Sequence, residues 1–261
     1  MRKFDLSRRR FLTASAVGAA SLPLAGCFDA AGTIGGPVRD TLERANSLTY
    51  RIQRLLLGSD HLAAEYAESE IRQPQRPNGT VSPQDDDYLA LADSQFGAYR
   101  LEVSGLVERP LSLSLDEIRN MPARTQITRH DCVEGWSCIA KWTGTPLGPL
   151  LDQAGVKPTA RYVMFECYDT MEQGFAGPVK YYESIDLIDA RHPQTILAYG
   201  LNGAALPVAN GAPLRVRVER QLGYKMAKYV RAIRLTDTLA GVGGGRGGYW
   251  EDYGYDWFGG I

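Results

Sequence analysis

The sequence is poor in cysteine, with four in 261 residues and no CxxC pair among them. That count is too low for a conventional iron–sulfur cluster or zinc site with four cysteine ligands. There is also no internal repeat, and no linker-like break follows residue 90. The body of the chain is therefore expected to form one large domain rather than two small ones.

The chain also lacks an excess of basic residues and a long apolar run. Its formal net charge is −1, and without residues 1–27 it would carry 24 Lys and Arg against 29 Asp and Glu, a net charge of about −5. This balance gives no support to nucleic-acid binding. The apolar run from Ala14 to Ala25 has about 12 residues, too few to span a bilayer.

The N-terminal segment has the pattern of an export signal. Ser7–Leu12 reads SRRRFL, which fits the twin-arginine motif, and the apolar run follows it. The run ends in LAGC at Cys27, which resembles the lipoprotein cleavage box of bacteria; a plain cleavable signal is the alternative. We expect residues 1–27 to be the signal and Cys27 to become a lipidated first residue. Export of folded proteins favours a cofactor enzyme on the periplasmic side of the membrane.

If Cys27 carries lipid, three cysteines remain, an odd number for an exported chain. At least one of them is then free or acts as a ligand. The alternative is a disulfide between Cys132 and either Cys138 or Cys167.

The remaining sequence divides into a short N-terminal part and a large domain. We expect residues 28–74 to form a tether and a helical segment, the helix covering Asp40–Leu57, and residues 75–261 to form the main domain. Residues 58–95 are polar and interrupted by prolines, so they are expected to wrap around the core rather than build it. The Gly-rich but aromatic tail, residues 241–261, is expected to pack over the mouth of a pocket.

Strand patterns dominate from Ala98 onward and predict a mixed, strand-rich α+β fold. The ranges predicted as strands or buried strand-like elements are 99–107, 124–130, 162–167, 185–190, 196–201, 214–218 and 229–236. Short helices are expected at 115–121, opened by Ser114, and at 147–154, ended by Gly155.

The stretch RHDCVEGWSCIAKWTGTP, Arg129–Pro146, is the strongest candidate for a catalytic segment. Cys132 ends a strand, and a turn-rich run is expected to follow it. A thiolate is a soft, strongly donating ligand, suited to a metal whose other ligands are sulfur. Cys132 is thus the candidate metal ligand, and Glu134 is a candidate acid or hydrogen-bond acceptor beside it.

A second set of residues is suited to an anionic cofactor. Asn210 and Arg215 lie in one turn, and Gly223-Tyr224-Lys225 follows with Lys228 beyond it. Glycine permits close approach of the backbone, while the other side chains donate hydrogen bonds or charge. Lys228 is expected to be the most solvated of the basic residues. Asn78, at the tip of the RPNG turn, is a further polar candidate.

These segments together resemble the molybdopterin-dependent oxidoreductases of the sulfite-oxidase fold. The resemblance rests on HDCVEGWS, on YYESIDL followed by HPQTILAYGLNG, and on NGAPLRVRVERQLGYKMAKYVRAI, and it covers roughly residues 75–258. It is greatest to the catalytic subunit of periplasmic methionine-sulfoxide reductase systems, whose ligand segment also reads CVE-x-WS. The sulfite-oxidase fold is therefore the expected form of the α+β domain.

The resemblance implies a molybdenum–molybdopterin cofactor with Cys132 as the protein ligand to the metal. The residues that it implies for contact with the pterin are Asn78, Cys167, Asn210, Arg215, Gly223, Tyr224 and Lys225. Cys167 falls where the reductase has a threonine. The resemblance also implies a substrate-site tyrosine near the C-terminus, as in sulfite oxidases; Tyr253 and Tyr255 are the candidates, and we predict Tyr253.

The chain departs from sulfite oxidases directly after the ligand cysteine, where Val133-Glu134-Gly135-Trp136 replaces a basic cluster. This argues against sulfite as substrate. We expect oxygen-atom transfer on a small or protein-bound substrate, with electrons exchanged through a separate haem protein or a quinone-linked membrane subunit. Two alternatives remain open: a metal-free binding module of the same fold, and a structural zinc protein using His130, Cys132 and Cys138.

Overall fold

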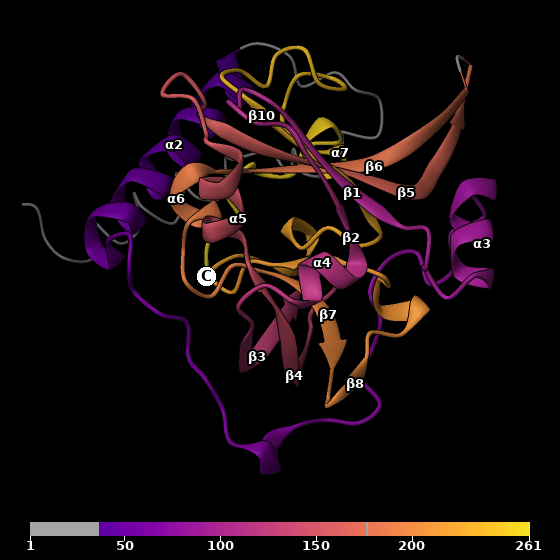
Figure 1. The fold of residues 1–261 in the computed structure, drawn as a ribbon. Coiled ribbons are helices and arrows are strands. Elements are labelled where there is room, and N and C mark those ends of the chain that lie inside the picture. Colours follow the sequence, from indigo (N-terminus) through magenta and orange to yellow (C-terminus); the bar gives the residue numbers. More distant parts are fainter. Residues whose placement is uncertain (1–36, 176) are drawn as a thin grey trace, which may run out of the picture. The chain divides into compact units, whose positions relative to one another are not determined.

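The computed structural model describes residues 37–175 and 177–261 (Figure 1). The chain divides into two units, Met1–Thr49 and Tyr50–Ile261, and the boundary falls inside helix α2 (Pro37–Leu57). The helix expected from Asp40 is confirmed and begins three residues earlier. The export signal and Cys27 lie outside the described residues. Within the described part, no helix has both the length and the apolar character needed to cross a membrane.

The first of two five-stranded sheets contains both the first and the last strand of the fold. Its order is β2 (Leu111–Ser114), β1 (Arg100–Gly105), β10 (Val230–Thr236), β5 (Tyr162–Gly174) and β6 (Gly177–Asp186). The β1–β10 pair is parallel and the other pairs are antiparallel. Pairing of β1 with β10 joins segments about 130 residues apart in sequence, so this sheet closes the domain.

The second sheet is antiparallel and carries the candidate catalytic segment. Its order is β3 (Arg124–Cys132), β4 (Trp136–Pro146), β7 (Ile196–Leu201) and β8 (Ala204–Ala205), with β9 (Arg215–Arg217) also paired to β7. Strands β4 and β7 approach closely at Gly144, where an added Cβ would lie 2.2 Å from the carbonyl oxygen of Leu197. Glycine is therefore required at this crossing.

Short helices lie between the two sheets and fill the core (Figure 1). Helix α4 (Leu115–Arg119) begins with a capping box in which Ser114 and Glu117 exchange hydrogen bonds. Helix α5 (Leu147–Ala154) buries Leu147, Leu150 and Leu151 and ends at Gly155 in the left-handed conformation. Both helices were expected from the sequence. The remaining helical elements are η3 (Glu68–Glu70), α6 (Leu187–Ala190), η4 (Val208–Asn210), η5 (Gly223–Lys225) and α7 (Tyr249–Asp252).

Three local expectations were wrong. The run after Cys132 is not turn-rich: residues 133–135 form one tight turn, and Trp136–Pro146 is an 11-residue strand. Residues 58–95 do not merely wrap the core, because helix α3 (Asp86–Asp93) buries Tyr88 against it. The range 185–190 is not a separate element, since it joins the end of β6 to α6. In each case backbone pairing or burial overrides a polar or Gly-containing local sequence.

A buried ion cluster fastens the C-terminal segment to the domain. Lys225 donates to the carboxylates of Glu183 on β6 and Glu251 on α7, and all three side chains are almost completely buried. Burial and the neighbouring Glu251 raise the pKa of Glu183 well above its usual value. The cluster therefore holds α7, and the aromatic tail around it, in one place.

We predict that Lys225→Met lowers the free energy of unfolding by about 3–5 kcal/mol, because two buried carboxylates lose their shared cation. Glu183, with its raised pKa, binds protons more readily in the folded than in the unfolded protein, so the loss should be larger at pH 8 than at pH 5. Urea unfolding at both pH values measures it.

Lys141→Met is the matched control, since it removes a lysine whose partner, Glu68, is largely exposed. Its loss should be small at either pH. Equal losses for the two variants would show that the buried cluster does not fasten the tail.

Candidate functional site

The β3–β4 hairpin places Cys132 at a defined point. Cys132 is the last residue of β3 and lies opposite Trp136, the first residue of β4. Gly135 closes the turn with φ of +83°, and its N–H donates to the Cys132 carbonyl at 3.0 Å. The thiol is thus held by a nine-pair antiparallel ladder rather than by a loose loop.

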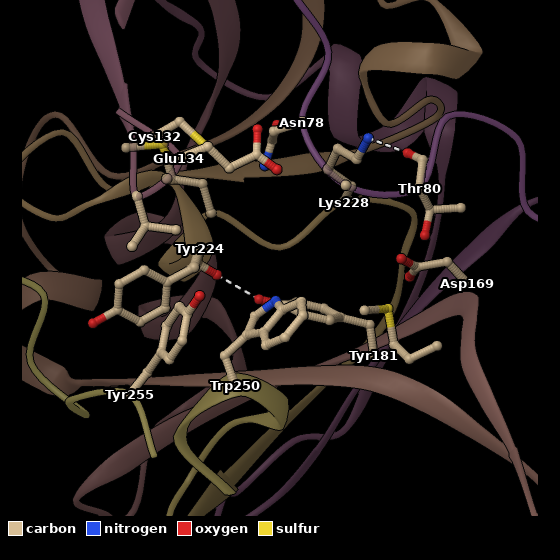
Figure 2. Close-up of a pocket in the computed structure, with 15 residues that line it drawn as sticks. Asn78, Thr80, Cys132, Glu134, Asp169, Tyr181, Tyr224, Lys228, Trp250 and Tyr255 are labelled. Carbon is tan, nitrogen blue, oxygen red and sulfur yellow. Dashed lines mark hydrogen bonds between the residues drawn. The ribbon is translucent and has the colours of Figure 1, made fainter. Parts of the chain in front are cut away.

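Cys132 faces a cavity of about 700 Å³, which includes the open space at its mouth (Figure 2). This volume is in the range of cofactor and ligand sites. The residues that line the cavity come from the β3–β4 turn, residues 78–80, β5, β6, η5 and the C-terminal tail. They are Asn78, Gly79, Thr80, Cys132, Val133, Glu134, Asp169, Met171, Tyr181, Gly223, Tyr224, Met226, Lys228, Trp250 and Tyr255.

The thiol of Cys132 is half-buried and is protonated when no metal is bound. Burial raises its pKa, and the backbone N–H of Glu134 and the nearby Arg76 lower it only in part. Glu134 lies beside it in the same cavity, and its carboxylate accepts a hydrogen bond from the indole N–H of Trp136 at 2.8 Å. Cys132 and Glu134, which the sequence grouped as candidates, thus line one cavity, and their roles as ligand and acid stay predictions.

One buried cation, Lys228, lines the cavity, and a second, Arg215, is buried in contact with the lining residues Asn78 and Met226. Arg215 donates to the carbonyls of Asn210 and Met226 and to the side-chain oxygen of Asn78, and its Nε atom has no partner. Lys228 donates to the carbonyls of Thr80 and Ala209. Among the described residues, neither cation forms an ion pair with a carboxylate.

The expectation that Lys228 is solvated was wrong. Its side chain is 5% exposed and lines the cavity, as Figure 2 shows. Burial and the charge of Arg215 lower the pKa of Lys228 to about 7, and burial and the charge of Arg217 lower that of Arg215 to about 9. A bound anion would relieve both costs.

Backbone and amide groups complete this side of the site. Asn78 lines the cavity, and Asn210 is buried behind it with its side chain near the carbonyl of Gln75. Gly223 lies against the buried ring of His130, because an added Cβ would be 2.4 Å from that ring. His130 has a pKa far below its usual value, through burial and Arg217, and its Nε2 has no partner.

Four of the candidate cofactor residues, Cys167, Asn210, Arg215 and Lys225, are not among the residues that line the cavity, and two of them are engaged elsewhere. Lys225 is adjacent in sequence to the lining residue Tyr224, but its ammonium group is engaged by Glu183 and Glu251. Cys167 is 2% exposed in the hydrophobic core, and burial raises the pKa of its thiol well above the usual value. The side chains of these residues are not among those that line the cavity.

The tail contributes Tyr255 and Trp250 rather than Tyr253. Tyr253 is 59% exposed, and its hydroxyl donates to Glu172 at 2.8 Å outside the cavity. Tyr255 and Trp250 stack with their ring centroids 5.4 Å apart, and both line the cavity opposite Cys132 (Figure 2). The sequence predicted that the tail covers the mouth of the pocket and that Tyr253 is its substrate-site tyrosine. The turn at Gly254 separates the two tyrosines, and Tyr255 rather than Tyr253 lines the cavity.

Sequence reasoning missed three further residues of the cavity: Asp169, Tyr181 and Trp250. Asp169 is 4% exposed, one carboxylate oxygen has no partner, and burial raises its pKa to about 6. A carboxylate directly after the apolar strand run YVMFECY was the available signal for it. Tyr181 and Trp250 gave no signal that distinguishes them from ordinary core aromatic residues.

The alternatives that used the cysteines differently find no support. Cys132, Cys138 and Cys167 are all free thiols. In residues 37–175 and 177–261, no group of three or more His, Cys, Asp or Glu side chains is arranged to hold a metal ion. A structural zinc site with His130, Cys132 and Cys138 therefore does not form.

The residues present fit a molybdopterin cofactor. Its phosphate requires cations, and Arg215 and Lys228 are buried cations whose hydrogen-bond acceptors are neutral oxygens. The Nε atom of Arg215 has no hydrogen-bond partner. Its metal requires a soft ligand, and the half-buried thiol of Cys132 lies in the same cavity. The site thus supplies the two kinds of group at different points of one pocket.

Comparison with known proteins gives the same result. Residues 89–241 match the oxidoreductase molybdopterin-binding domain family. The chain is 39% identical to a putative protein-methionine-sulfoxide reductase subunit, YedZ1, of Azospira oryzae, over 97% of this chain and 88% of the relative.

Similarity extends to catalytic subunits named MsrP. The protein-methionine-sulfoxide reductase catalytic subunit of Xanthomonas campestris is 39% identical over 59% of this chain and 50% of its own length, and that of Ralstonia nicotianae 38% over 53% and 44%. The chain thus spans half or less of these two relatives. The sulfane dehydrogenase SoxCD structure from Paracoccus pantotrophus is 26% identical over 54% of this chain and 39% of its own, with a TM-score of 0.48.

The matched domain covers more than half of the chain, and it contains the candidate ligand, the cationic side of the cavity and Gly223-Tyr224-Lys225. The expected fold class, enzyme class and cofactor are thereby confirmed, and the metal-free binding module is set aside. The chain belongs to the family of oxidoreductases that carry a molybdopterin-binding domain.

Proposed function

We propose that this chain transfers an oxygen atom from a sulfoxide-type substrate, or to the corresponding thioether, with Cys132 as the protein ligand to molybdenum. The observation that carries the proposal is one cavity lined by the thiol of Cys132 and by the buried cation Lys228, with Arg215 buried against the lining residue Asn78 and neither cation paired with a carboxylate among the described residues. The bound cofactor supplies the two-electron redox chemistry. The protein residues bind it, orient it and control access.

Cys132 would hold the metal as a thiolate, so its thiol would have to lose a proton on binding. Burial raises the pKa of its thiol, so ligation releases a proton that the free thiol retains at neutral pH. Glu134 is positioned to accept that proton, since its carboxylate lies in the same cavity and is oriented by the Trp136 indole. The same carboxylate can exchange protons with solvent, because Glu134 is exposed.

Arg215, Lys228 and Asn78 bind the anionic end of the cofactor. The guanidinium of Arg215 has an unpartnered Nε, and Lys228 gains its full charge when an anion arrives. Because Gly223 carries no side chain, the backbone of η5 packs against the His130 ring and lines the cavity directly. Asp169, with a free carboxylate oxygen, accepts a hydrogen bond from a donor on the ligand.

Trp250, Tyr255 and Met171 form the apolar wall across the cavity from Cys132. Aromatic and thioether groups suit the methyl and sulfur atoms of a methionine-sulfoxide-type substrate. The relatives named as protein-methionine-sulfoxide reductases support this class, either as a small molecule or as an oxidised residue of a protein. Electrons are exchanged with a separate carrier, a haem protein or a quinone-linked membrane subunit.

The enzyme is proposed to act on the periplasmic side of the membrane. The SRRRFL motif directs export by the twin-arginine route, and the LAGC box makes Cys27 the lipidated first residue. The support for both is the sequence pattern of residues 7–27.

Replacement of the ligand should separate chemistry from folding. We predict that Cys132→Ser loses molybdenum and more than about 99% of kcat but still unfolds cooperatively, because the Cys132 side chain is only half-buried at the end of β3. Metal analysis, steady-state turnover of methionine sulfoxide and calorimetry measure these three quantities.

Cys138→Ser is the matched control, since Cys138 is a buried thiol on the neighbouring strand and does not line the cavity. It should keep the metal even if stability falls. Normal molybdenum content in Cys132→Ser would contradict the assignment of the ligand.

Anion binding should depend on pH through Lys228. We predict that the affinity of the cofactor-free protein for inorganic sulfate falls about fivefold to tenfold between pH 6.5 and 8, because Lys228, with a pKa of about 7, loses its proton. Sulfate does not titrate in this range. Calorimetric titration measures the affinity, and Lys228→Met should bind more weakly and without this dependence; an unchanged dependence would assign the titration to another group.

The apolar wall should contribute to substrate binding rather than to the metal. We predict that Trp250→Ala raises KM for N-acetylmethionine sulfoxide about tenfold, with kcat within about twofold and molybdenum content unchanged. Tyr253→Phe, in the same tail but outside the cavity, should behave as the wild type. Equal KM for Trp250→Ala and wild type would remove Trp250 from the substrate site.

A further inference from the structure

The C-terminal half of α2 and the loop after it expose an unpartnered set of large aliphatic side chains. Ile52, Leu55, Leu56 and Leu62 are 45%, 83%, 75% and 49% exposed. Ile52, Leu55 and Leu56 have the i, i+3, i+4 spacing of a single helix face. Large aliphatic groups gathered on one face of a soluble domain mark an interaction site.

The opposite face of this helix end is fastened to the domain. Arg54 forms ion pairs with Asp186 and Asp189, and the Tyr50 hydroxyl donates to Asp186 at 2.8 Å. The Arg54 guanidinium also lies 4.9 Å from the centre of the Phe258 ring. The helix end therefore cannot turn to bury Leu55 and Leu56 without breaking buried ion pairs, and the aliphatic face stays outward.

The charges around this face are basic. Between Leu48 and Leu57 the helix contains Arg51 and Arg54 and no acidic residue, and Asp60 follows in the loop before Leu62. Arg54 is engaged by its carboxylate partners, whereas Arg51 is exposed beside the aliphatic residues. A mature chain with a net charge of about −5 thus presents a local basic and aliphatic surface. This combination is typical of helices that lie in the plane of an anionic membrane surface.

The position of this helix in the chain favours the same occupant. Ten positions separate Pro37, where α2 begins, from Cys27, the proposed lipidation site. A connection of this length reaches at most about 35 Å when fully extended. An anchor at Cys27 would hold the domain close to a bilayer, which raises the effective concentration of lipid at an otherwise weak binding surface.

We propose that Ile52, Leu55, Leu56 and Leu62, with Arg51, form a docking surface for an anionic phospholipid membrane. The aliphatic side chains enter the boundary between headgroups and acyl chains, and Arg51 contacts lipid phosphates. The surface acts as a second membrane contact in addition to lipidation and does not depend on the catalytic activity or its substrate.

The test is sedimentation of the cofactor-loaded chain that begins at Phe28 and carries no lipid, mixed with vesicles of phosphatidylcholine alone or with phosphatidylglycerol. The expected result is binding to the anionic vesicles that weakens as salt is raised and is weaker to neutral vesicles. Leu55→Ser together with Leu56→Ser should reduce the bound fraction at least about tenfold, since both side chains lose their apolar burial.

The control is Leu89→Ser with Val208→Ser, which removes two exposed aliphatic side chains elsewhere, 38% and 37% exposed. Its vesicle binding should equal that of the wild type. Molybdenum content and turnover of all three proteins should be the same, which shows that each variant is folded.

Two results would overturn the proposal. One is the absence of binding to anionic vesicles at low salt, and the other is equal binding by the wild type and the Leu55/Leu56 variant. If the chain sediments only with vesicles that contain an integral membrane protein of the same host, and this requires Leu55 and Leu56, the surface is a protein contact and the lipid proposal is wrong.

Discussion

The site depends on the burial of two positive charges that the protein does not neutralise by itself. Arg215 and Lys228 are held by carbonyl and amide oxygens. Burial lowers both pKa values, and a neighbouring cation adds to this in each case: Arg217 for Arg215 and Arg215 for Lys228. Such a pair is costly in the cofactor-free protein. The cost is removed by an anionic ligand, so cofactor binding and stability of this part of the fold are linked.

The fold brings three distant segments to this pair. The β3–β4 hairpin positions Cys132. Pairing of β4 with β7, which approach closely at Gly144, joins this hairpin to the rest of the second sheet. The Lys225 cluster fastens the tail that carries Trp250 and Tyr255. Lys225 thus contributes to the site by holding its outer wall. The cavity has a polar side and an aromatic side because different sheets and loops supply their residues.

Much of the framework follows from local sequence. The helix at 147–154, the capped helix after Ser114 and the strands around β1 and β10 have clear patterns and end signals. Cys132, Glu134, Asn78, Gly223 and Tyr224 were placed in one site from motif and resemblance. Tertiary structure decided the rest. Lys225 and Lys228 lie in one short segment and look alike in the sequence. Lys225 forms ion pairs with carboxylates of β6 and α7, whereas Lys228 faces the cavity, and no local sequence pattern reveals this difference. The Tyr253–Tyr255 choice likewise depends on the backbone turn at Gly254.

The most direct test of the account is X-ray absorption spectroscopy at the molybdenum edge of the purified enzyme, which counts sulfur ligands. The account predicts three sulfurs in the wild type, two from the pterin dithiolene and one from Cys132, and two in any metal retained by Cys132→Ala. A sulfur count that is the same in both proteins would contradict the assignment of Cys132 as the ligand and, with it, the proposed arrangement of the site.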